Sequence, residues 1–276
     1  MSITTNQPLP GPAMPKRYHI VFAHPEPRSL NGFLRDRAIA GLQERGHVVT
    51  QSDLYAMRFK ATADAEDFPE RDFSEERLIY HRESGMAQAH GEQRDDITTE
   101  QARLLAADAI ILQFPLWWFS MPAILKGWVD RVFATGFAIG VPKDGTGQWL
   151  RYGEGLLAGR RAMLAVTTGG REAQFGARGI HGPIDDLLFP INHGILHYVG
   201  LEAVAPWVAY QTTRLTAEAA DDLATDYLAR LLSIFDTPPI GYRSENGGDY
   251  DDRQLLRPDI ATGAGFAAHI DQTGGS

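Results

Sequence analysis

The sequence predicts an α/β protein built on a doubly wound parallel sheet of five strands, with helices on both faces. Three observations support this prediction. Four continuous apolar runs are typical of strands buried on both faces, and helical patterns separate them. The unusual loops all follow the ends of predicted strands, where open α/β sheets bind their ligands.

The five expected strands are short apolar or β-branched segments. In chain order they are YHIVFAH from Tyr18, HVVTQSDL from His47, AIILQF from Ala109, AMLAVTT from Ala162 and AVAPWVAY from Ala203. The run from His47 is shorter and more polar than the others, which suits a strand near an edge of the sheet.

Helical patterns lie between these strands. Leu30 to Glu44 follows the first strand, and Thr98 to Ala107 opens with a capping box because Gln101 stands three residues after Thr98. Pro122 suits the first turn of the next helix. Thr216 can cap the last helix, whose apolar stripe consists of Leu223, Tyr227, Leu228, Leu231 and Phe235.

The alternation of strand and helix defines one domain, residues 17–236. Residues 1–16 are rich in proline, glycine and polar side chains, which predicts a disordered leader. Residues 237–276 show little periodicity and are expected to form an extension that packs on the domain or on a dimer partner. The segments 55–96 and 139–157 are irregular and are interpreted as insertions, the second a possible flap.

Composition excludes several classes of function. The chain has no cysteine, so disulfides, thiolate metal sites and cysteine nucleophiles are ruled out. A net charge of −9 argues against nucleic acid or an anionic membrane as partner. No apolar run approaches the roughly 18 residues of a membrane helix. We therefore expect a cytoplasmic protein that acts on a small molecule.

The loop AHPEPRSLNG, residues 23–32, follows the first strand and ends at a helix mouth. Free backbone N–H groups there attract anions, so Ser29 and Asn31 are candidates for binding phosphate, and His24 could donate to the same group. The alternative is that Ser29 only caps the helix and that His24 is structural.

Two further loops suit a flat ligand. Thr167, Thr168, Gly169 and Gly170 offer hydroxyls and unobstructed amides, as the polar edge of an isoalloxazine requires, although a glycine turn is an equal alternative. The segment FPLWWFSMP, residues 114–122, offers aromatic rings that either fill the core or form a flat wall. A glycine turn beside such a wall favours a stacked heteroaromatic cofactor.

These motifs carry a family resemblance. AHPEPRSLN, SDLYAM, QFPLWWFSMPAILKGWVDRVF, TTGG, GIHG and GILHYVG resemble the NAD(P)H:quinone oxidoreductases, or DT-diaphorases, of the flavodoxin-like superfamily, from about Tyr18 to about Pro239. The resemblance implies a homodimer that contains FAD in preference to FMN, with its active site at the subunit interface. It also implies ping-pong hydride transfer from NAD(P)H to the flavin and then to a quinone or related electrophile.

The resemblance also implies roles for individual residues. The FAD phosphates are expected near His24, Ser29, Leu30 and Asn31, and the flavin ring against Pro115, Leu116, Trp117, Trp118 and Phe119, with its polar edge on Thr167, Thr168, Gly169 and Gly170. Phe175 is also expected to contact the cofactor. His181, with Gly169 and Gly170, is expected to stabilise charge on the reduced flavin. The expected substrate pocket comprises Trp118, Phe119, Ile139, Val141, Phe175, His181 and Tyr198.

The chain departs from the family pattern at three places. Phe175 stands where the family has an active-site tyrosine, and Ile139 and Val141 stand where it has two tyrosines over the substrate. His193 and His197 match a metal site of one family branch, but that site also needs a cysteine, so no metal is expected. Two other functions remain open: an ancillary subunit of a transport system, and an FMN electron carrier.

Overall fold

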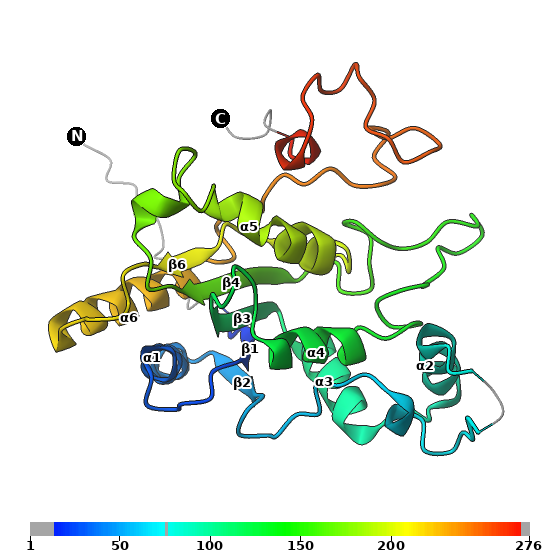
Figure 1. The fold of residues 1–276 in the computed structure, drawn as a ribbon, viewed down its shortest axis with the longest axis horizontal. Helices are drawn as coiled ribbons and strands as arrows, with labels where there is room; N and C mark the ends of the chain where they lie inside the picture. The colour runs from blue at the N-terminus through cyan, green and yellow to red at the C-terminus, as the bar shows by residue number, and fades with distance from the viewer. Residues whose placement is uncertain (1–13, 75–76, 272–276) are drawn as a thin grey trace, which may run out of the picture.

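The computed structural model describes residues 14–74 and 77–271 and contains the predicted parallel sheet (Figure 1). The strands run in the order β2-β1-β3-β4-β5, and β6 also pairs with β4. Their bounds are β1 Arg17–Phe22, β2 Val48–Asp53, β3 Ala109–Pro115, β4 Arg161–Thr167, β5 Glu202–Ala203 and β6 Trp207–Ala209. All pairs are parallel, so the parallel sheet expected from the sequence is confirmed.

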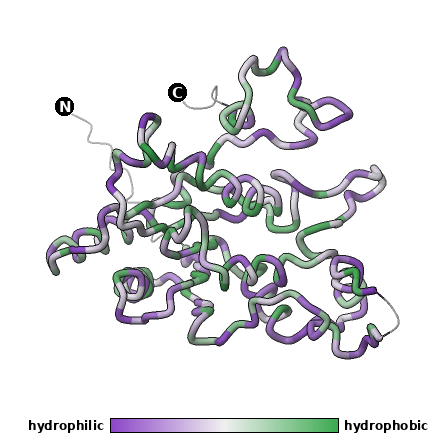
Figure 2. The backbone as a smooth tube through the Cα atoms, in the orientation of Figure 1, coloured by the Kyte–Doolittle hydropathy of each residue, from purple (hydrophilic) through white to green (hydrophobic). Residues whose placement is uncertain are grey.

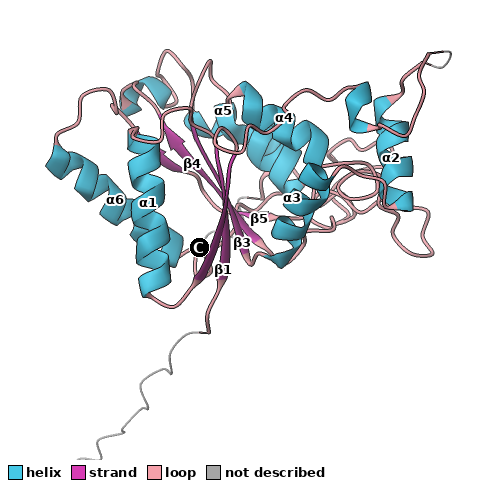
Figure 3. Cartoon of the chain, turned by 90° about the horizontal axis from the view of Figure 1, so that it is seen from below, coloured by secondary structure: helices cyan, strands magenta, loops and turns pink. Residues whose placement is uncertain are grey.

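Helices cover both faces of the sheet, as Figure 3 shows edge-on. Their bounds are α1 Leu30–Glu44, α2 Tyr80–His90, α3 Asp95–Ala106, α4 Ala123–Val132, α5 Ile184–Ile191 and α6 Ala217–Leu232, with short 3₁₀ turns at η1 Ala65–Asp67, η2 Glu172–Phe175 and η4 Phe266–His269. A π-helical segment, η3 Asn192–His197, continues α5. Helices α1 and α6 pack on one face, while α3, α4 and α5 pack on the other. None of the helices within the described ranges is long and apolar enough to cross a membrane.

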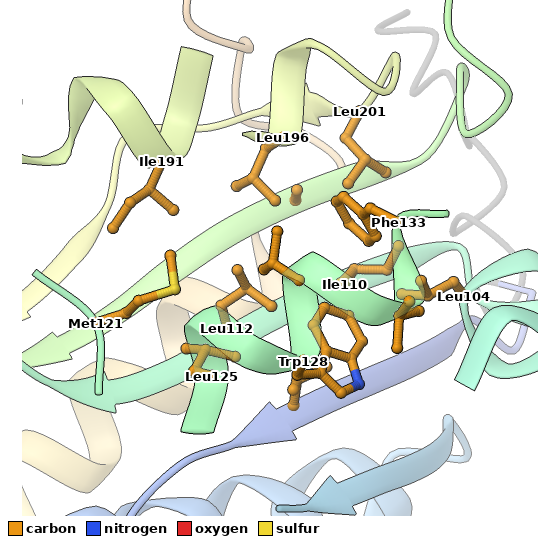
Figure 4. Close-up of a cluster of buried hydrophobic side chains, with 14 of the residues drawn as sticks. Leu104, Ile110, Leu112, Met121, Leu125, Trp128, Phe133, Ile191, Leu196 and Leu201 are labelled. Atoms are coloured by element: carbon orange, nitrogen blue, oxygen red, sulfur yellow. The ribbon is translucent and has the colours of Figure 1, made fainter. Parts of the chain in front are cut away.

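The central strand β3 joins two apolar layers. Its even-numbered residues from Ile110 to Phe114 face the layer of α3, α4 and α5, and Figure 4 shows Ile110 and Leu112 between Trp128 of α4 and Leu196. Ala109 and Ile111 face the layer of α1 and α6 instead. Every residue of β3 is buried, which explains its continuous apolar sequence. Figure 2 colours the chain by residue hydropathy and shows hydrophobic and hydrophilic residues interspersed along most of its length.

The register of the strands brings the three predicted binding loops to one edge of the sheet. Gln113 of β3 lies beside Phe22 of β1 and Ala165 of β4, and Pro115 pairs with Thr167. The loops that leave β1, β3 and β4 therefore start within neighbouring rungs of the sheet.

The expected fifth strand consists of two pieces. β5 and β6 both pair with β4 but are separated by a segment containing Pro206. Proline has no N–H to donate to a ladder, so the strand breaks there and resumes at Trp207.

Three predictions for segments between the strands need correction. α3 begins at Asp95, and Thr98 lies inside it, where its hydroxyl donates to the carbonyl of Asp95. Pro122 precedes α4 as its N-cap residue. The segment 55–96 is less irregular than expected because it contains α2, and its buried Asp67 forms an ion pair of 2.9 Å with Arg131 of α4.

The predicted insertion 139–157 and the C-terminal region contact each other. Arg151 and Glu245 form an ion pair of 2.6 Å, and Phe266 stacks on Phe189 of α5 with ring centroids 4.3 Å apart. Of the expected leader, residues 1–13 lie outside the described residues, as do residues 272–276 of the extension.

Candidate active site

The mouth of α1 is formed by close packing of the preceding loop. Ser29 is the N-cap residue, and its hydroxyl accepts from the N–H of Gly32 at 3.2 Å. A Cβ atom on Gly32 would lie 1.8 Å from the carbonyl oxygen of Pro27, so only glycine permits this approach. Ser29 thus caps the helix, as the alternative interpretation stated, and Leu30 begins the helix. The phosphate-binding role of Ser29 stays a prediction.

His24 links this loop to the aromatic loop after β3. Its Nδ1 accepts from the N–H of Glu26 at 3.1 Å, which supports the structural reading of this histidine. Its ring centroid lies 6.0 Å from that of Trp117. The loops after β1 and β3 therefore meet, as the strand register requires.

Asn31 joins the helix mouth to the end of β4. The residue is 3% exposed, and its Nδ2 donates to the hydroxyl of Thr167 at 2.6 Å. Its Oδ1 is buried without a hydrogen-bond partner among the described residues. A buried acceptor of this kind is costly unless a ligand or water donates to it.

The aromatic loop makes a tight turn over Trp117–Ser120. Trp117 and Ser120 exchange backbone hydrogen bonds of 3.0 and 3.1 Å. The two central residues, Trp118 and Phe119, have φ values of 50° and 61°, the pattern of a type I′ turn. Non-glycine residues in this region cost about 1–3 kcal/mol each, and such strain gathers at functional sites.

This turn holds its rings outside the core. Trp118 is 94% exposed, while Trp117 and Phe119 are each about half exposed. Pro115 and Leu116 anchor the turn because the N–H of Leu116 donates to the carbonyl of Thr167 at 2.8 Å. The rings of Trp117, Trp118 and Phe119 are therefore accessible to a ligand, whereas Phe114 is a core residue.

The loop after β4 is closely packed at both predicted glycines. A Cβ atom on Gly169 would lie 2.7 Å from the hydroxyl of Thr213, and one on Gly170 would lie 2.7 Å from the ring of Phe175. The N–H of Thr168 donates to the carbonyl of Ala209 at 2.8 Å, which ties the loop to β6. A side chain at either position would therefore have to displace the side chain of Thr213 or of Phe175.

His181 lies between two aromatic rings. The centroid of its half-buried imidazole is 5.2 Å from that of Phe119 and 4.9 Å from that of Phe175. Its backbone N–H donates to the carbonyl of Gln174 at 2.9 Å, which fixes the loop after η2. The structure thus brings together Phe119, Phe175, His181 and the glycine turn, four features that the sequence analysis assigned to one site.

Tyr210 extends this row and was missed by sequence reasoning. Its ring centroid lies 5.7 Å from that of Phe175. Burial raises the pKa of Tyr210, and the charges of Glu172 and Asp185 add to the effect, so the phenol stays neutral. A signal was available, because Tyr210 directly follows β6 at the carboxyl edge of the sheet.

Ile139, Val141 and Tyr198 do not join this row within one chain. Tyr198 precedes β5, whose Glu202 pairs with Arg161 at the amino end of β4, opposite to Thr167. The insertion that carries Ile139 and Val141 lies at that same end, since the N–H of Tyr152 donates to the carbonyl of Tyr198 at 3.0 Å. In Figure 1 the insertion lies on the right and the loop from β4 to α5 on the left.

His193 and His197 share a face of η3, with ring centroids 5.5 Å apart. Burial, together with the neighbouring His197 and His269, lowers the pKa of His193 to about 4. Aromatic rings surround the pair, including Tyr152. Within residues 14–74 and 77–271, no group of three or more histidine, aspartate or glutamate side chains could hold a metal ion.

Comparison with known proteins gives consistent results. Residues 16–233 match the family described as having a flavodoxin-like fold. A ribosyldihydronicotinamide dehydrogenase-like protein of Penicillium crustosum is 47% identical over 91% of this chain and 94% of its own. An NAD(P)H dehydrogenase (quinone) of Cavia porcellus is 35% identical over 82% of this chain and 79% of its own. A crystal structure from Klebsiella pneumoniae, described as a candidate quinone reductase, is 48% identical, with a TM-score of 0.89 and coverage of 93% and 100%.

Proposed function

The chain belongs to the family with the flavodoxin-like fold, and we propose that it catalyses the flavin-dependent, two-electron reduction of quinones by a reduced nicotinamide. One observation carries the proposal: the rings of Phe119, His181 and Phe175 lie in a row beside the glycine turn. The names of the two relatives indicate the substrate classes, a quinone and a reduced nicotinamide compound.

The residues present fit a flavin. The unpartnered Oδ1 of Asn31 can accept from a hydroxyl of the ligand, and Gly169 and Gly170 carry no side chain that would keep a ligand from their backbone amides. The exposed rings of Trp118 and Phe119 supply a flat surface. That the flavin is FAD in preference to FMN follows from the likeness to the quinone oxidoreductases.

The chain's own residues contribute orientation and charge stabilisation. When bound, the flavin would accept two electrons from the nicotinamide and deliver them to the quinone. Trp118 and Phe119 would hold planar substrates in van der Waals contact, which makes the transfer effectively unimolecular. The imidazole of His181 would stabilise negative charge at the ring edge, and one such donor is worth about 3 kcal/mol in comparable sites.

A second copy of the chain would complete the pocket. Ile139, Val141 and Tyr198 lie towards the other end of the sheet in this chain, so they would line the row of another subunit. The exposed Trp118 and Ile180 support this arrangement, because large exposed apolar side chains at one edge are typical of interaction sites. A homodimer with a shared active site is therefore part of the proposal.

We propose that the site recognises the reductant by its nicotinamide ring. The two relatives are named after different reductants, NAD(P)H and ribosyldihydronicotinamide, which share that ring. Stacking on the Trp118 and Phe119 wall requires only the ring. NADPH, NADH and the ribosyl compound should therefore be compared as donors.

The proposal is tested on the purified chain. We expect a yellow protein from which a flavin can be released and identified by mass. The nicotinamide should be oxidised rapidly only when a quinone is supplied, with one equivalent of hydroquinone formed per equivalent of nicotinamide. A protein that stays colourless after incubation with FAD and FMN would refute the assignment, and transfer of single electrons only would favour a carrier.

A further inference from the structure

We propose that Gln113 and Tyr227 are positioning residues for the flavin site. With Asn31 and Thr167 they form a buried hydrogen-bond chain, here called the Gln113 relay, that fixes the mouth of α1 relative to the end of β4. The inference rests on the proposed function, since flavin binding is its readout.

The Gln113 relay connects four separate elements of the fold. The hydroxyl of Tyr227 on α6 donates to Oε1 of Gln113 on β3 at 3.2 Å. Nε2 of Gln113 donates to the carbonyl of Asn31 on α1 at 2.7 Å. Nδ2 of Asn31 then donates to the hydroxyl of Thr167, the last residue of β4, at 2.6 Å. All four side chains are buried.

The side chain of Gln113 is a polar amide within an otherwise apolar layer. Its neighbours on the same face of β3, Ala109 and Ile111, belong to the apolar layer under α1 and α6. An amide in such a layer is unfavourable unless it is hydrogen-bonded, and an apolar side chain of similar size would avoid that cost. Both ends of the Gln113 amide are bonded. The amide also lies only two residues before the end of β3, next to the binding loops.

Tyr227 is a fixed end for the relay. Its hydroxyl is a neutral donor because complete burial raises its pKa. Its ring lies 4.7 Å from that of Trp207 on β6, and the indole N–H of Trp207 donates to Asp226 on α6 at 2.7 Å. The relay thus begins at a phenol held between a helix and the sheet.

The two ends joined by the relay serve different parts of the proposed ligand. Ser29 and Asn31 lie at the helix mouth, which attracts phosphate, and Thr167 opens the loop that would meet the ring edge. FAD would contact both ends at once, so it gains from a fixed separation between them. Lumiflavin, which has the ring but no ribityl phosphate, would contact only the ring end.

The test compares these two ligands on a variant that lacks the relay. The double substitution Gln113→Leu and Tyr227→Phe removes both partners of the bond between these two side chains, so that neither is left unpaired. The backbone carbonyl of Asn31 loses the bond from Gln113. We expect the Kd of FAD, measured by fluorescence titration, to rise about tenfold, while the Kd of lumiflavin stays within about twofold. Urea unfolding should show that the variant remains folded.

Leu42→Ala is the matched control. Leu42 lies in the same apolar layer, near the other end of α1, and takes no part in the relay. This substitution should lower stability but leave the ratio of the FAD and lumiflavin affinities unchanged. The inference is overturned if the double variant binds both ligands as the native chain does, if it weakens both equally, or if the control changes the ratio as much. In each of these cases tight FAD binding by the native chain would leave the proposed function standing, whereas a native chain that binds neither ligand would overturn both.

Discussion

The imidazole of His181 and the phenyl ring of Phe175 lie 4.9 Å apart between centroids, at an interplanar angle of 46°. Phe175 is 5% exposed and stands where the quinone oxidoreductases that this chain resembles carry a tyrosine. A phenyl ring offers packing but no hydrogen-bond donor. In the proposed function, His181 is therefore the member of this pair that would stabilise negative charge at the flavin edge.

Phe175→Tyr should restore the missing donor. We expect the variant to retain flavin and to be reduced by NADPH up to about tenfold faster, because a second donor would meet the developing charge. Stopped-flow measurement of flavin reduction gives the rate. Phe266→Tyr adds the same hydroxyl in η4, on the ring that stacks on Phe189, and should leave the rate unchanged. An unchanged rate in Phe175→Tyr would mean that this ring does not meet the reacting edge.

His181→Ala should bind flavin but slow its reduction. The loss of one donor to a developing charge costs about 10²-fold in rate. His181→Gln, which keeps an N–H donor, should fall between the native chain and His181→Ala. His90→Ala changes an exposed histidine in α2 and serves as control. Reduction of His181→Ala at the native rate would contradict the role given to this histidine.

Local signals in the sequence predicted most of the fold. The bounds of α1 and the cap of α6 were correct because Ser29 and Thr216 each bond to a backbone N–H three residues ahead. The start of α3 was not predicted correctly, because a capping-box pattern at Thr98 also fits the interior of a helix. The break between β5 and β6 could have been expected from Pro206.

The site was predicted as a set of loops but not as a set of contacts. The strand ends indicated which loops meet, and the row of Phe119, His181 and Phe175 lies where they do. The position of the Phe119 ring in this row depends on the positive φ values of Trp118 and Phe119, which no local sequence pattern predicts. The bond between Gln113 and Tyr227 spans 114 positions in the sequence, so only the packing of α6 on β3 reveals it.

Relieving the backbone strain at Trp118 and Phe119 should stabilise the fold and weaken substrate binding. Asn-Gly is the preferred pair for a type I′ turn, so Trp118→Asn with Phe119→Gly should stabilise the fold by about 1–2 kcal/mol. The same change removes both wall rings, and we expect the KM for quinone to rise about tenfold. Urea unfolding and steady-state kinetics measure the two effects.

Arg58→Asn provides the control for this turn. Arg58 is exposed, has a φ of 50° and lies in the segment that follows β2, so its replacement relieves similar strain away from the proposed site. It should leave KM unchanged. If the double turn variant were no more stable than the native chain, the backbone at Trp118 would not be strained. If its KM were unchanged, the two rings would not form a substrate wall.

His19 should make the fold sensitive to acid. The residue is fully buried on β1, where its Nδ1 is hydrogen-bonded to Thr50 at 2.9 Å and its Nε2 to Ser52 at 3.2 Å. Burial, together with the charge of Arg103, lowers the pKa of His19 from 6.5 to about 4. The unfolded chain therefore binds a proton at a higher pH than the folded chain does. The contribution of His19 to the free energy of unfolding is fully present above about pH 6.5. It is lost as the pH decreases towards 4, which lowers stability by about 3 kcal/mol.

His19→Asn isolates this contribution, because an amide can bond to Thr50 and Ser52 but does not titrate. Free energies of unfolding measured in urea at about pH 7.5 and about pH 4 should differ less in the variant, by about 3 kcal/mol. His193, whose pKa is also lowered to about 4, is present in both proteins and cancels in the comparison. An equal pH dependence in the two proteins would show that the folded chain protonates His19 as readily as the unfolded chain does, which the enclosed position on β1 argues against.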